Sequence, residues 1–199
     1  MPAFSLSDVR EARIPVLIAA PHGGRAYPEE IEAVMRNPAI AKLRLEDRLV
    51  DRLAVSIAEI SGAAMLVAHA PRAMLDLNRA PDDLDWSMIE GGRPAGSSHS
   101  SANRRARGGL GLVPGVGEIW RTSLARSDVA DRLAGIHEPY HRALKRALDD
   151  LRKAWGVALL VDLHSMPPLR SRHYGERKVE FVIGDRFGVS CDDQLASRA

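Results

Sequence analysis

Residues 13–20 read RIPVLIAA, and PHGGRAYP follows them directly over residues 21–28. The first segment is a short, continuous apolar run with β-branched residues, closed by a proline and two glycines. Such a run predicts a strand that is buried on both faces, as in a parallel or mixed sheet. His22 therefore stands where a buried strand ends, and its imidazole belongs either to a turn or to a functional site.

Apolar segments of this kind alternate along the chain with segments of helical periodicity. Buried strands are predicted over residues 63–70, 157–165 and 179–185, with a further short strand over 73–77. Helices are predicted over residues 28–37, 45–62 and 127–156. This alternation predicts an α/β fold, in the form of three α/β/α layers around a central mixed, mostly parallel sheet.

Two of the predicted helices carry a clear apolar stripe. Gly62 supplies a C-terminal stop for the helix over 45–62. In the helix over 127–156, Ser127 is the expected N-cap, and Pro139 is expected to kink or divide the helix. The stripes consist of Leu49, Leu53, Ile57 and Ile60 in the first helix, and of Leu144, Leu148 and Leu151 in the second.

The composition bounds the class of protein. The chain has 199 residues, enough for a single domain with its own core, and its 28 basic side chains nearly balance 26 acidic ones. Only residues 100–109 are locally basic, so nucleic-acid binding is not expected. The N-terminus lacks a signal-peptide pattern, and no apolar run approaches the ~20 residues of a membrane span. Cys191 stands alone, which rules out an internal disulfide, and a cytoplasmic protein is predicted.

Residues 80–117 differ from the rest of the chain. They are rich in glycine, serine, proline and charged residues, and their periodicity is weak. A loop of this length in a compact domain is usually functional or mobile. Because strands and helices alternate on both sides of it, we interpret it as a long active-site loop and not as a linker.

Polar side chains follow three of the apolar segments at comparable places. His22 and His164 each end a predicted strand, and a third segment ends with Asp76, Asn78 and Arg79. In open α/β sheets, ligands gather beyond the carboxyl ends of the strands. Two imidazoles and one carboxylate also make a familiar open zinc site, in which a fourth position is left for water or substrate. The sequence therefore predicts a metal site at this edge of the sheet.

The residues alone leave the carboxylate ligand open. Asp47 opens a predicted helix, Asp51 lies one turn further on, and Asp76 lies near a strand end. Asp162 precedes His164 by two residues, so the two side chains share one face of a strand. Asp162 is therefore also a candidate acceptor for an imidazole N–H, outside the set of metal ligands.

A set of ordered motifs gives the chain a specific resemblance. It resembles the N-formylglutamate amidohydrolase family over nearly its whole length, from His22 to Cys191. That family resembles the zinc carboxypeptidases in fold, and DLHS looks like their strand with the second histidine ligand. The fold implied is thus a hydrolase-like α/β/α arrangement. The motifs are PHGGRAYP, EDRLVDRL, RAMLDLNR, RGGLGLVP, EPYHRAL, VDLHSMPP and VIGDRFGVSC.

The resemblance implies a metal-dependent amidase that cleaves N-formyl-L-glutamate to formate and L-glutamate, late in histidine breakdown. It implies that His22 and His164 are the metal histidines of a site with one Zn²⁺ per chain. Arg25 occupies the position at which carboxypeptidases usually have a glutamate ligand. We therefore expect Asp47, in the segment that matches another family motif, to supply the carboxylate ligand.

The resemblance also implies how the substrate is held. Asn78 and Arg79 resemble the asparagine–arginine pair that holds a substrate carboxylate in the carboxypeptidases. A planar guanidinium suits this task because it donates two parallel hydrogen bonds to a carboxylate. His141 and Ser165 are further candidates for contacts with the substrate.

Members of this family usually continue well beyond the segment 182–191, and their later part carries a strand-borne glutamate that looks like the general base. The resemblance therefore implies that the chain lacks the family's C-terminal part and that the base lies beyond residue 199. Two other functions stay open. One is an amidase or peptidase acting on another N-acyl amino acid or a small peptide, and the other is a non-catalytic ligand-binding relative.

Overall fold

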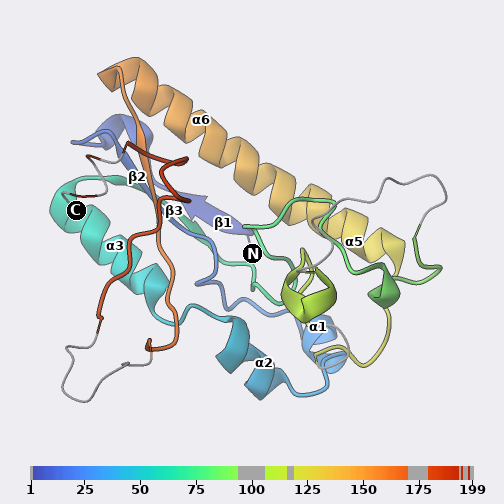
Figure 1. The fold of residues 1–199 in the computed structure, drawn as a ribbon. Coiled ribbons are helices and arrows are strands. Elements are labelled where there is room, and N and C mark those ends of the chain that lie inside the picture. The colour runs from blue at the N-terminus through green and yellow to red at the C-terminus, as the bar shows by residue number, and fades with distance from the viewer. Residues whose placement is uncertain are drawn as a thin grey trace, which may run out of the picture. The chain divides into compact units, whose positions relative to one another are not determined.

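The computed structural model describes residues 2–93, 106–115, 119–169 and 179–192, together with Gln194 and Ser197. The chain divides into two compact units, residues 1–165 and 166–199, and each is described by itself. All labelled strands and helices of Figure 1 belong to the first unit. The strands are β1 (Phe4–Leu6), β2 (Val16–Ala20), β3 (Ala64–Ala68) and β4 (Leu159–Asp162). The helices are α1 (Glu29–Ala33), α2 (Pro38–Leu45), α3 (Val50–Ser61), α5 (Arg126–Arg132) and α6 (Glu138–Trp155).

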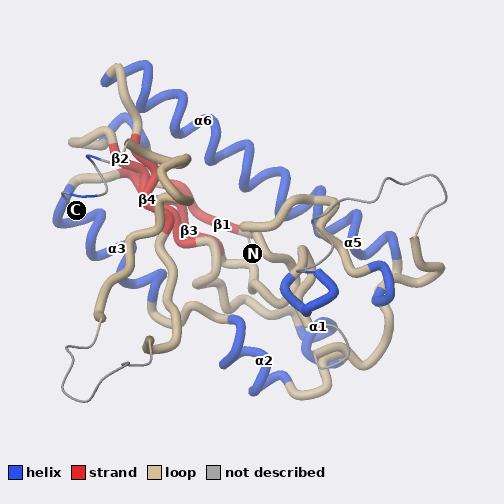
Figure 2. The backbone as a smooth tube through the Cα atoms, viewed as in Figure 1, coloured by secondary structure: helices blue, strands red, loops and turns tan. Residues whose placement is uncertain are grey.

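The strands form one sheet, drawn in red in Figure 2. Their order in the sheet is β1-β3-β2-β4. β2 pairs in parallel with both β3 and β4, so that Ala19 lies opposite Leu66 on one side and Asp162 on the other. β1, which the sequence did not predict, pairs antiparallel with β3. The prediction of an α/β fold with a mixed, mostly parallel sheet is confirmed.

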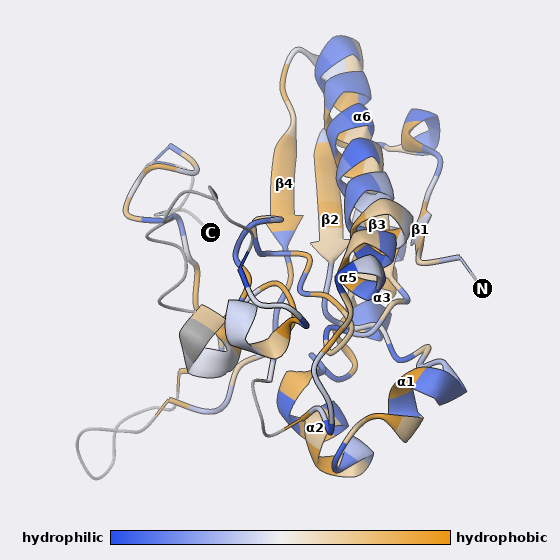
Figure 3. Ribbon diagram, turned by 90° about the vertical axis from the view of Figure 1, so that its right-hand side faces the viewer, coloured by the Kyte–Doolittle hydropathy of each residue, from blue (hydrophilic) through white to orange (hydrophobic). Residues whose placement is uncertain are grey.

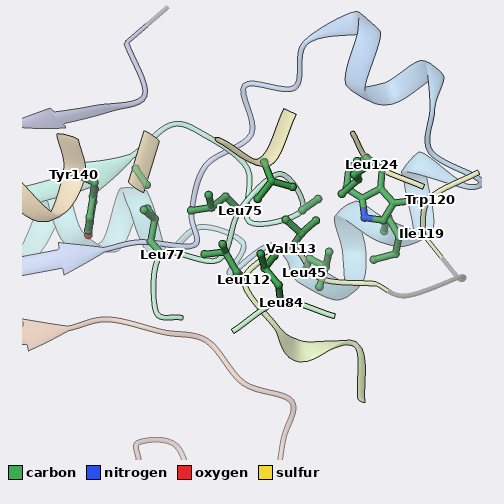
Figure 4. Packing of buried hydrophobic residues seen from close by; sticks show 14 of the residues in the cluster. Leu45, Leu75, Leu77, Leu84, Leu112, Val113, Ile119, Trp120, Leu124 and Tyr140 are labelled. Atoms are coloured by element: carbon green, nitrogen blue, oxygen red, sulfur yellow. The ribbon is translucent and has the colours of Figure 1, made fainter. Parts of the chain in front are cut away.

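Helices cover both faces of this sheet. Successive side chains of a strand point to opposite faces, and Leu17 of β2 packs in one apolar cluster with Leu151 of α6. Its neighbour Ile18 packs in a second cluster with Val50 and Ala54 of α3. The first cluster extends beyond the sheet, as Figure 4 shows, into a core built from loop residues together with Leu45 at the end of α2. These include Leu45, Leu75, Leu77, Leu84, Leu112, Val113, Ile119, Trp120 and Leu124.

α3 presents a different face to the sheet from the one predicted. Its buried positions are Val50, Ala54 and Ala58, because small side chains let the helix backbone lie close to the sheet. The leucine and isoleucine stripe predicted for residues 45–62 is therefore not the face that packs on the sheet. Three of the four stripe residues are exposed, namely Leu49, Leu53 and Ile60.

The long helical segment near residue 139 is divided as predicted. α5 ends at Arg132, a wide π-helical turn covers Leu133–His137, and α6 then begins with Pro139 in its first turn. The predicted N-cap is wrong, because Ala125 occupies that position and Ser127 lies within the first turn of α5. The predicted stripe of α6 does face the core: Leu151 is buried there and Leu144 and Leu148 pack against it.

The N-terminal helices are shorter and more numerous than predicted. The predicted helix over 28–37 ends at Ala33, and a separate helix, α2, follows it. Asn37 caps α2 by accepting a hydrogen bond from the Ile40 N–H at 3.2 Å, and Pro38 occupies the first turn. Among the described residues, no helix combines the length and the apolarity that crossing a bilayer requires.

Three strand predictions need correction. Residues 73–77 form turns, with Leu75 and Leu77 buried. The predicted buried strand over 157–165 shortens to β4, which is half exposed because it lies at the edge of the described sheet. Residues 179–185 form no strand in the described part of the second unit. A strand needs a neighbour for its backbone hydrogen bonds, and the described residues of that unit contain none.

The long loop predicted over 80–117 packs into the first unit where it is described. Leu112 is fully buried, its N–H donates to the Asp83 carbonyl at 2.7 Å, and its own carbonyl accepts from the Asp76 N–H at 2.7 Å. Residues 94–105 and 116–118 lie outside the described residues. The described loop segments therefore support the backbone at Asp76.

Substitutions on α3 test the observed face. Ala54 has no exposed surface, so Ala54→Leu should lower the free energy of unfolding by about 1–3 kcal/mol through overpacking. Leu53 is 48 % exposed, so Leu53→Ala should lower it by less than about 1 kcal/mol. Urea unfolding of both variants measures the difference. A larger loss for Leu53→Ala would show that the leucine and isoleucine stripe is the face that packs on the sheet.

Candidate metal centre

Parallel pairing of β2 and β4 brings the two strand-end histidines together. The strands lie side by side and point in the same direction, and both are apolar along most of their length (Figure 3). The pairing continues past β4, because the Leu163 N–H donates to the Ala19 carbonyl at 2.8 Å. The rings of His22 and His164 consequently lie 4.8 Å apart between centroids.

Asp47 joins the two histidines from the turn between α2 and α3. Its backbone N–H donates to the His22 carbonyl at 3.0 Å, which fixes the turn against the end of β2. Its Oδ2 lies 2.9 Å from His164 Nδ1 and 3.7 Å from His22 Nδ1. One ligand atom from each of the three residues lies within 4.8 Å of the others, so this cluster can hold a metal ion.

His22 meets the requirements of a metal ligand. It is buried, and its Nε2 lies 2.8 Å from Asp76 Oδ1. Because a carboxylate only accepts, Nε2 carries the hydrogen and the neutral ring has a lone pair on Nδ1. That Nδ1 is buried and has no hydrogen-bond partner. A buried acceptor without a partner needs an explanation, and a bound cation beside Asp47 supplies one.

Asp76 is a fully buried carboxylate with several partners. Its Oδ2 accepts from Arg72 Nε at 2.9 Å and lies 2.9 Å from Arg72 Nη2 in an ion pair, and its Oδ1 accepts from the Asn78 N–H at 2.9 Å. Burial raises the pKa of Asp76, but the hydrogen bond from His22 and the charge of Arg72 oppose it, and the pKa is about 2. Asp76 is thus ionised, and it orients His22 from behind.

His164 lies between two carboxylates in the same way. Its Nδ1 faces Asp47, and its Nε2 lies 3.1 Å from Asp162 Oδ2. Burial lowers the pKa of His164, but Asp162 and Asp47 together raise it to about 9 in the metal-free protein. Burial raises the pKa of Asp47, yet its hydrogen bond to His164 holds that pKa well below the usual range. Asp162 thus occupies the place of an acceptor for an imidazole N–H.

The asparagine–arginine pair lies beside this cluster. The Asn78 Nδ2 donates to Asp162 Oδ2 at 2.8 Å and lies 2.9 Å from His164 Nε2. The Arg79 Nε is buried, has no hydrogen-bond partner and lies 3.8 Å from Asp76 Oδ2. The Arg79 guanidinium therefore keeps donor capacity beside Asp76, the carboxylate that contacts His22.

His141 and Ser165, the further candidates for substrate contacts, lie outside the cluster of His22, Asp47 and His164. The His141 Nε2 lies 2.9 Å from the Leu77 carbonyl, so its ring contacts the backbone next to Asn78. Ser165 is exposed and directly follows His164 at the end of the first unit. His137 was not among the predicted site residues, and its Nε2 lies 3.0 Å from the Arg79 carbonyl. Its spacing of four residues from His141 on a helix was the available signal.

The turn after β2 separates Asp51 from the cluster. Arg25 pairs with Asp51 Oδ2 at 2.5 Å. Gly24 packs so tightly that a Cβ atom there would lie 2.2 Å from the Ala70 carbonyl oxygen. The ion pair of Arg25 and Asp51 lines a pocket of about 290 Å³. Its lining consists of Gly23, Gly24, Arg25, Ala26, Asp51, Ala68 and His69.

An α/β sheet whose parallel strand ends gather two imidazoles and a carboxylate, with an asparagine–arginine pair alongside, defines a class of α/β protein with an open centre suited to a metal ion. A sequence profile of the N-formylglutamate amidohydrolase family matches residues 14–199. The chain belongs to that family, and the resemblance seen in the sequence motifs is confirmed.

Individual relatives agree with this assignment. The chain is 31 % identical over 195 residues to the N-formylglutamate deformylase of Pseudomonas aeruginosa, covering 95 % of this chain and 66 % of that one. It is 31 % identical over 194 residues to the N-formylglutamate deformylase of Pseudomonas putida, covering 94 % of this chain and 65 % of that one. The chain therefore spans about two thirds of the length of these curated relatives.

Solved structures show the same fold. The crystal structure of an N-formylglutamate amidohydrolase from Ralstonia eutropha superposes with a TM-score of 0.81 at 28 % identity, over 99 % of this chain and 71 % of that one. A gene product from Agrobacterium tumefaciens superposes with a TM-score of 0.56 at 18 % identity, over 90 % of this chain and 61 % of that one. At that identity, the second comparison concerns the fold alone.

The pH dependence of stability tests the surroundings of His141. Burial, and repulsion from His137 when both rings are charged, lower the pKa of His141 below its usual 6.5, and the Leu77 carbonyl and Asp162 oppose them only in part. The unfolded chain therefore takes up the proton more readily, and this residue lowers the free energy of unfolding as the pH falls below about 6.5. We expect His141→Gln to lose less stability than the wild type between about pH 8 and about pH 5.5.

Urea unfolding at the two pH values measures this difference. Glutamine is neutral throughout and keeps a donor for the Leu77 carbonyl. The comparison at the higher pH, where both side chains are uncharged, serves as the control. Equal losses in the two proteins would contradict the assigned environment.

Proposed function

We propose that this chain is a zinc-dependent amidohydrolase that cleaves N-formyl-L-glutamate to formate and L-glutamate, as a step of histidine catabolism. The family and the names of the relatives support the substrate. The observation that carries the metal dependence is the buried His22 Nδ1, which has no partner and faces the carboxylate that His164 also faces. We further propose that the whole protein has the fold of the zinc carboxypeptidases, to which the sequence motifs point.

The donor set suits Zn²⁺. Two imidazole nitrogens and one carboxylate oxygen are three protein ligands, which leaves a position for water or substrate. Asp76 and Asp162 hold the opposite nitrogens of the two rings, as the partners of metal-ligating histidines usually do. When bound, the ion supplies Lewis acidity, which polarises a carbonyl and lowers the pKa of water.

The remaining residues orient the substrate. Arg79 binds a carboxylate of N-formyl-L-glutamate through its guanidinium, and Asn78 contributes its side-chain amide next to the reacting group. Fixing the carboxylate places the formyl carbon beside the two histidines, so part of the rate enhancement comes from positioning. In the overall reaction, water adds to the formyl carbon, the C–N bond breaks, and the glutamate amine takes up the proton.

Zinc content tests the ligand assignment. We expect the wild-type chain to bind about one Zn²⁺, and Asp47→Asn to weaken binding by at least about 100-fold because it removes a charged ligand. Asp51→Asn is the matched control, since Asp51 lies one helical turn away and pairs with Arg25. Competition titration with a chromogenic chelator measures both affinities.

The His22→Ala variant, like the Asp47→Asn variant, should lose the bound Zn²⁺. If Asp47→Asn keeps wild-type affinity while Asp51→Asn loses it, the carboxylate ligand is Asp51. If both keep full affinity and His22→Ala does as well, the centre is not a metal site.

Steady-state kinetics test the substrate and the role of Arg79. Arg79→Ala should lower kcat/KM for N-formyl-L-glutamate by about 100-fold, because a charge-assisted bidentate hydrogen bond is lost. The matched control is Arg10→Ala, which removes an exposed arginine paired with Asp8. Formate release is measured for N-formyl-L-glutamate and for N-formyl-L-glutamine. Unchanged kinetics of Arg79→Ala would reject carboxylate binding by this residue, and preference for another N-acyl amino acid would reject the substrate.

A further inference from the structure

Two histidines of one helix hold the backbone on either side of Asn78. His141 Nε2 lies 2.9 Å from the Leu77 carbonyl, and His137 Nε2 lies 3.0 Å from the Arg79 carbonyl. The two rings also contact each other, with 4.3 Å between their centroids. The segment that carries both substrate-binding candidates is therefore bracketed by a pair of imidazoles.

The partners fix the tautomer of both rings. A backbone carbonyl only accepts hydrogen bonds, so each Nε2 carries a hydrogen. His137 is buried, and two charged rings at this separation would repel each other. Neutral rings with hydrogen on Nε2 satisfy both carbonyls without that cost.

The helix is shaped to present this pair. A π-helical turn over Leu133–His137 ends at the first histidine, and Pro139 follows two residues later. In a regular helix, the ring of Pro139 would press against the carbonyl of Gly135, and the wide turn relieves this contact. Such turns occur frequently at functional sites. The spacing of four residues then directs His137 and His141 to one side of the helix.

The bracketed segment has no strand or helix of its own to fix it. Its turn is held from within by Asp76, whose Oδ1 accepts from the Asn78 N–H at 2.9 Å and whose carbonyl accepts from the Arg79 N–H at 3.1 Å. These bonds fix the N–H groups of Asn78 and Arg79. The two histidines fix the carbonyls of Leu77 and Arg79, on either side of Asn78.

We infer that His137 and His141 act as a clamp that positions Asn78 and Arg79 for substrate binding. This inference rests on the proposed function, in which those two side chains hold the substrate. The clamp touches neither the substrate nor the ion, so both histidines are positioning residues. Losing the clamp should weaken substrate binding and leave the metal ligands in place.

Paired variants separate positioning from packing. The double variant His137→Leu/His141→Leu removes both donors, and His137→Gln/His141→Gln keeps a donor at a similar reach. Lys145→Leu, on the exposed side of α6, is the matched control. The full chain is assayed for KM and kcat with N-formyl-L-glutamate, for Zn²⁺ affinity and for Tm.

Two lost hydrogen bonds should raise the KM of the leucine double variant by about tenfold or more. We expect its Zn²⁺ affinity to stay within about twofold of the wild type. The KM of the glutamine double variant should lie close to that of the wild type. If the leucine double variant does not fold, the two single leucine variants take its place. Long-range ¹H–¹⁵N spectra should show both imidazoles with hydrogen on Nε2.

An unchanged KM in the leucine variants would overturn the clamp, as would a parallel loss of Zn²⁺ affinity, or hydrogen on Nδ1 of either ring. The Arg79→Ala variant separates this failure from failure of the proposed function. If Arg79→Ala raises KM and the leucine variants do not, only the clamp is wrong. If Arg79→Ala leaves KM unchanged, carboxylate binding itself is wrong.

Discussion

The rest of the centre depends on the burial of one carboxylate, that of Asp76. An ionised carboxylate removed from water is strongly destabilising unless it is paired and hydrogen-bonded. Here His22, Arg72 and the Asn78 N–H supply the compensating contacts. These groups come from the end of β2 and from the turns after β3. Asp76 therefore holds the two segments together beyond the point where the strand pairing ends.

This constraint explains how the centre is layered. Each imidazole lies between two carboxylates, His22 between Asp76 and Asp47, and His164 between Asp162 and Asp47. The outer carboxylates set the orientation of the rings, and the inner one faces both Nδ1 atoms. Under the proposed function, this arrangement would orient the ligand atoms before a metal ion binds, as outer partners do in metal centres.

The fold was predictable where the pattern is local. The apolar runs at β2 and β3 and the stripe of α6 identify their elements because burial on both faces or on one stripe leaves a periodic signature. β1 has only three residues and gains its structure from pairing with β3, so no local signal marks it. Which face of α3 is buried depends on how closely the helix approaches the sheet, and the pattern of hydrophobic residues alone does not determine that distance.

The centre was predictable in the same uneven way. His22 and His164 follow strands, so the sequence itself assigns them to one edge of the sheet. Asp47 could not be chosen over the other aspartates by spacing, because its position depends on a turn. In that turn Leu49 adopts a left-handed backbone with φ of 68°, which is uncommon for leucine. The clamp of His137 and His141 could not be predicted either, because it depends on a tertiary contact between the helical segment and the turn at Asn78.

The close approach at Gly24 limits how this family's chains can diverge. The loop after β2 lies directly on the backbone at the end of β3, with no space for even a methyl group. Any larger residue there would lift the loop, and with it the neighbouring histidine, away from its carboxylate. The backbone contact at this position therefore requires glycine, whereas the exposed residues of the loop meet no such limit.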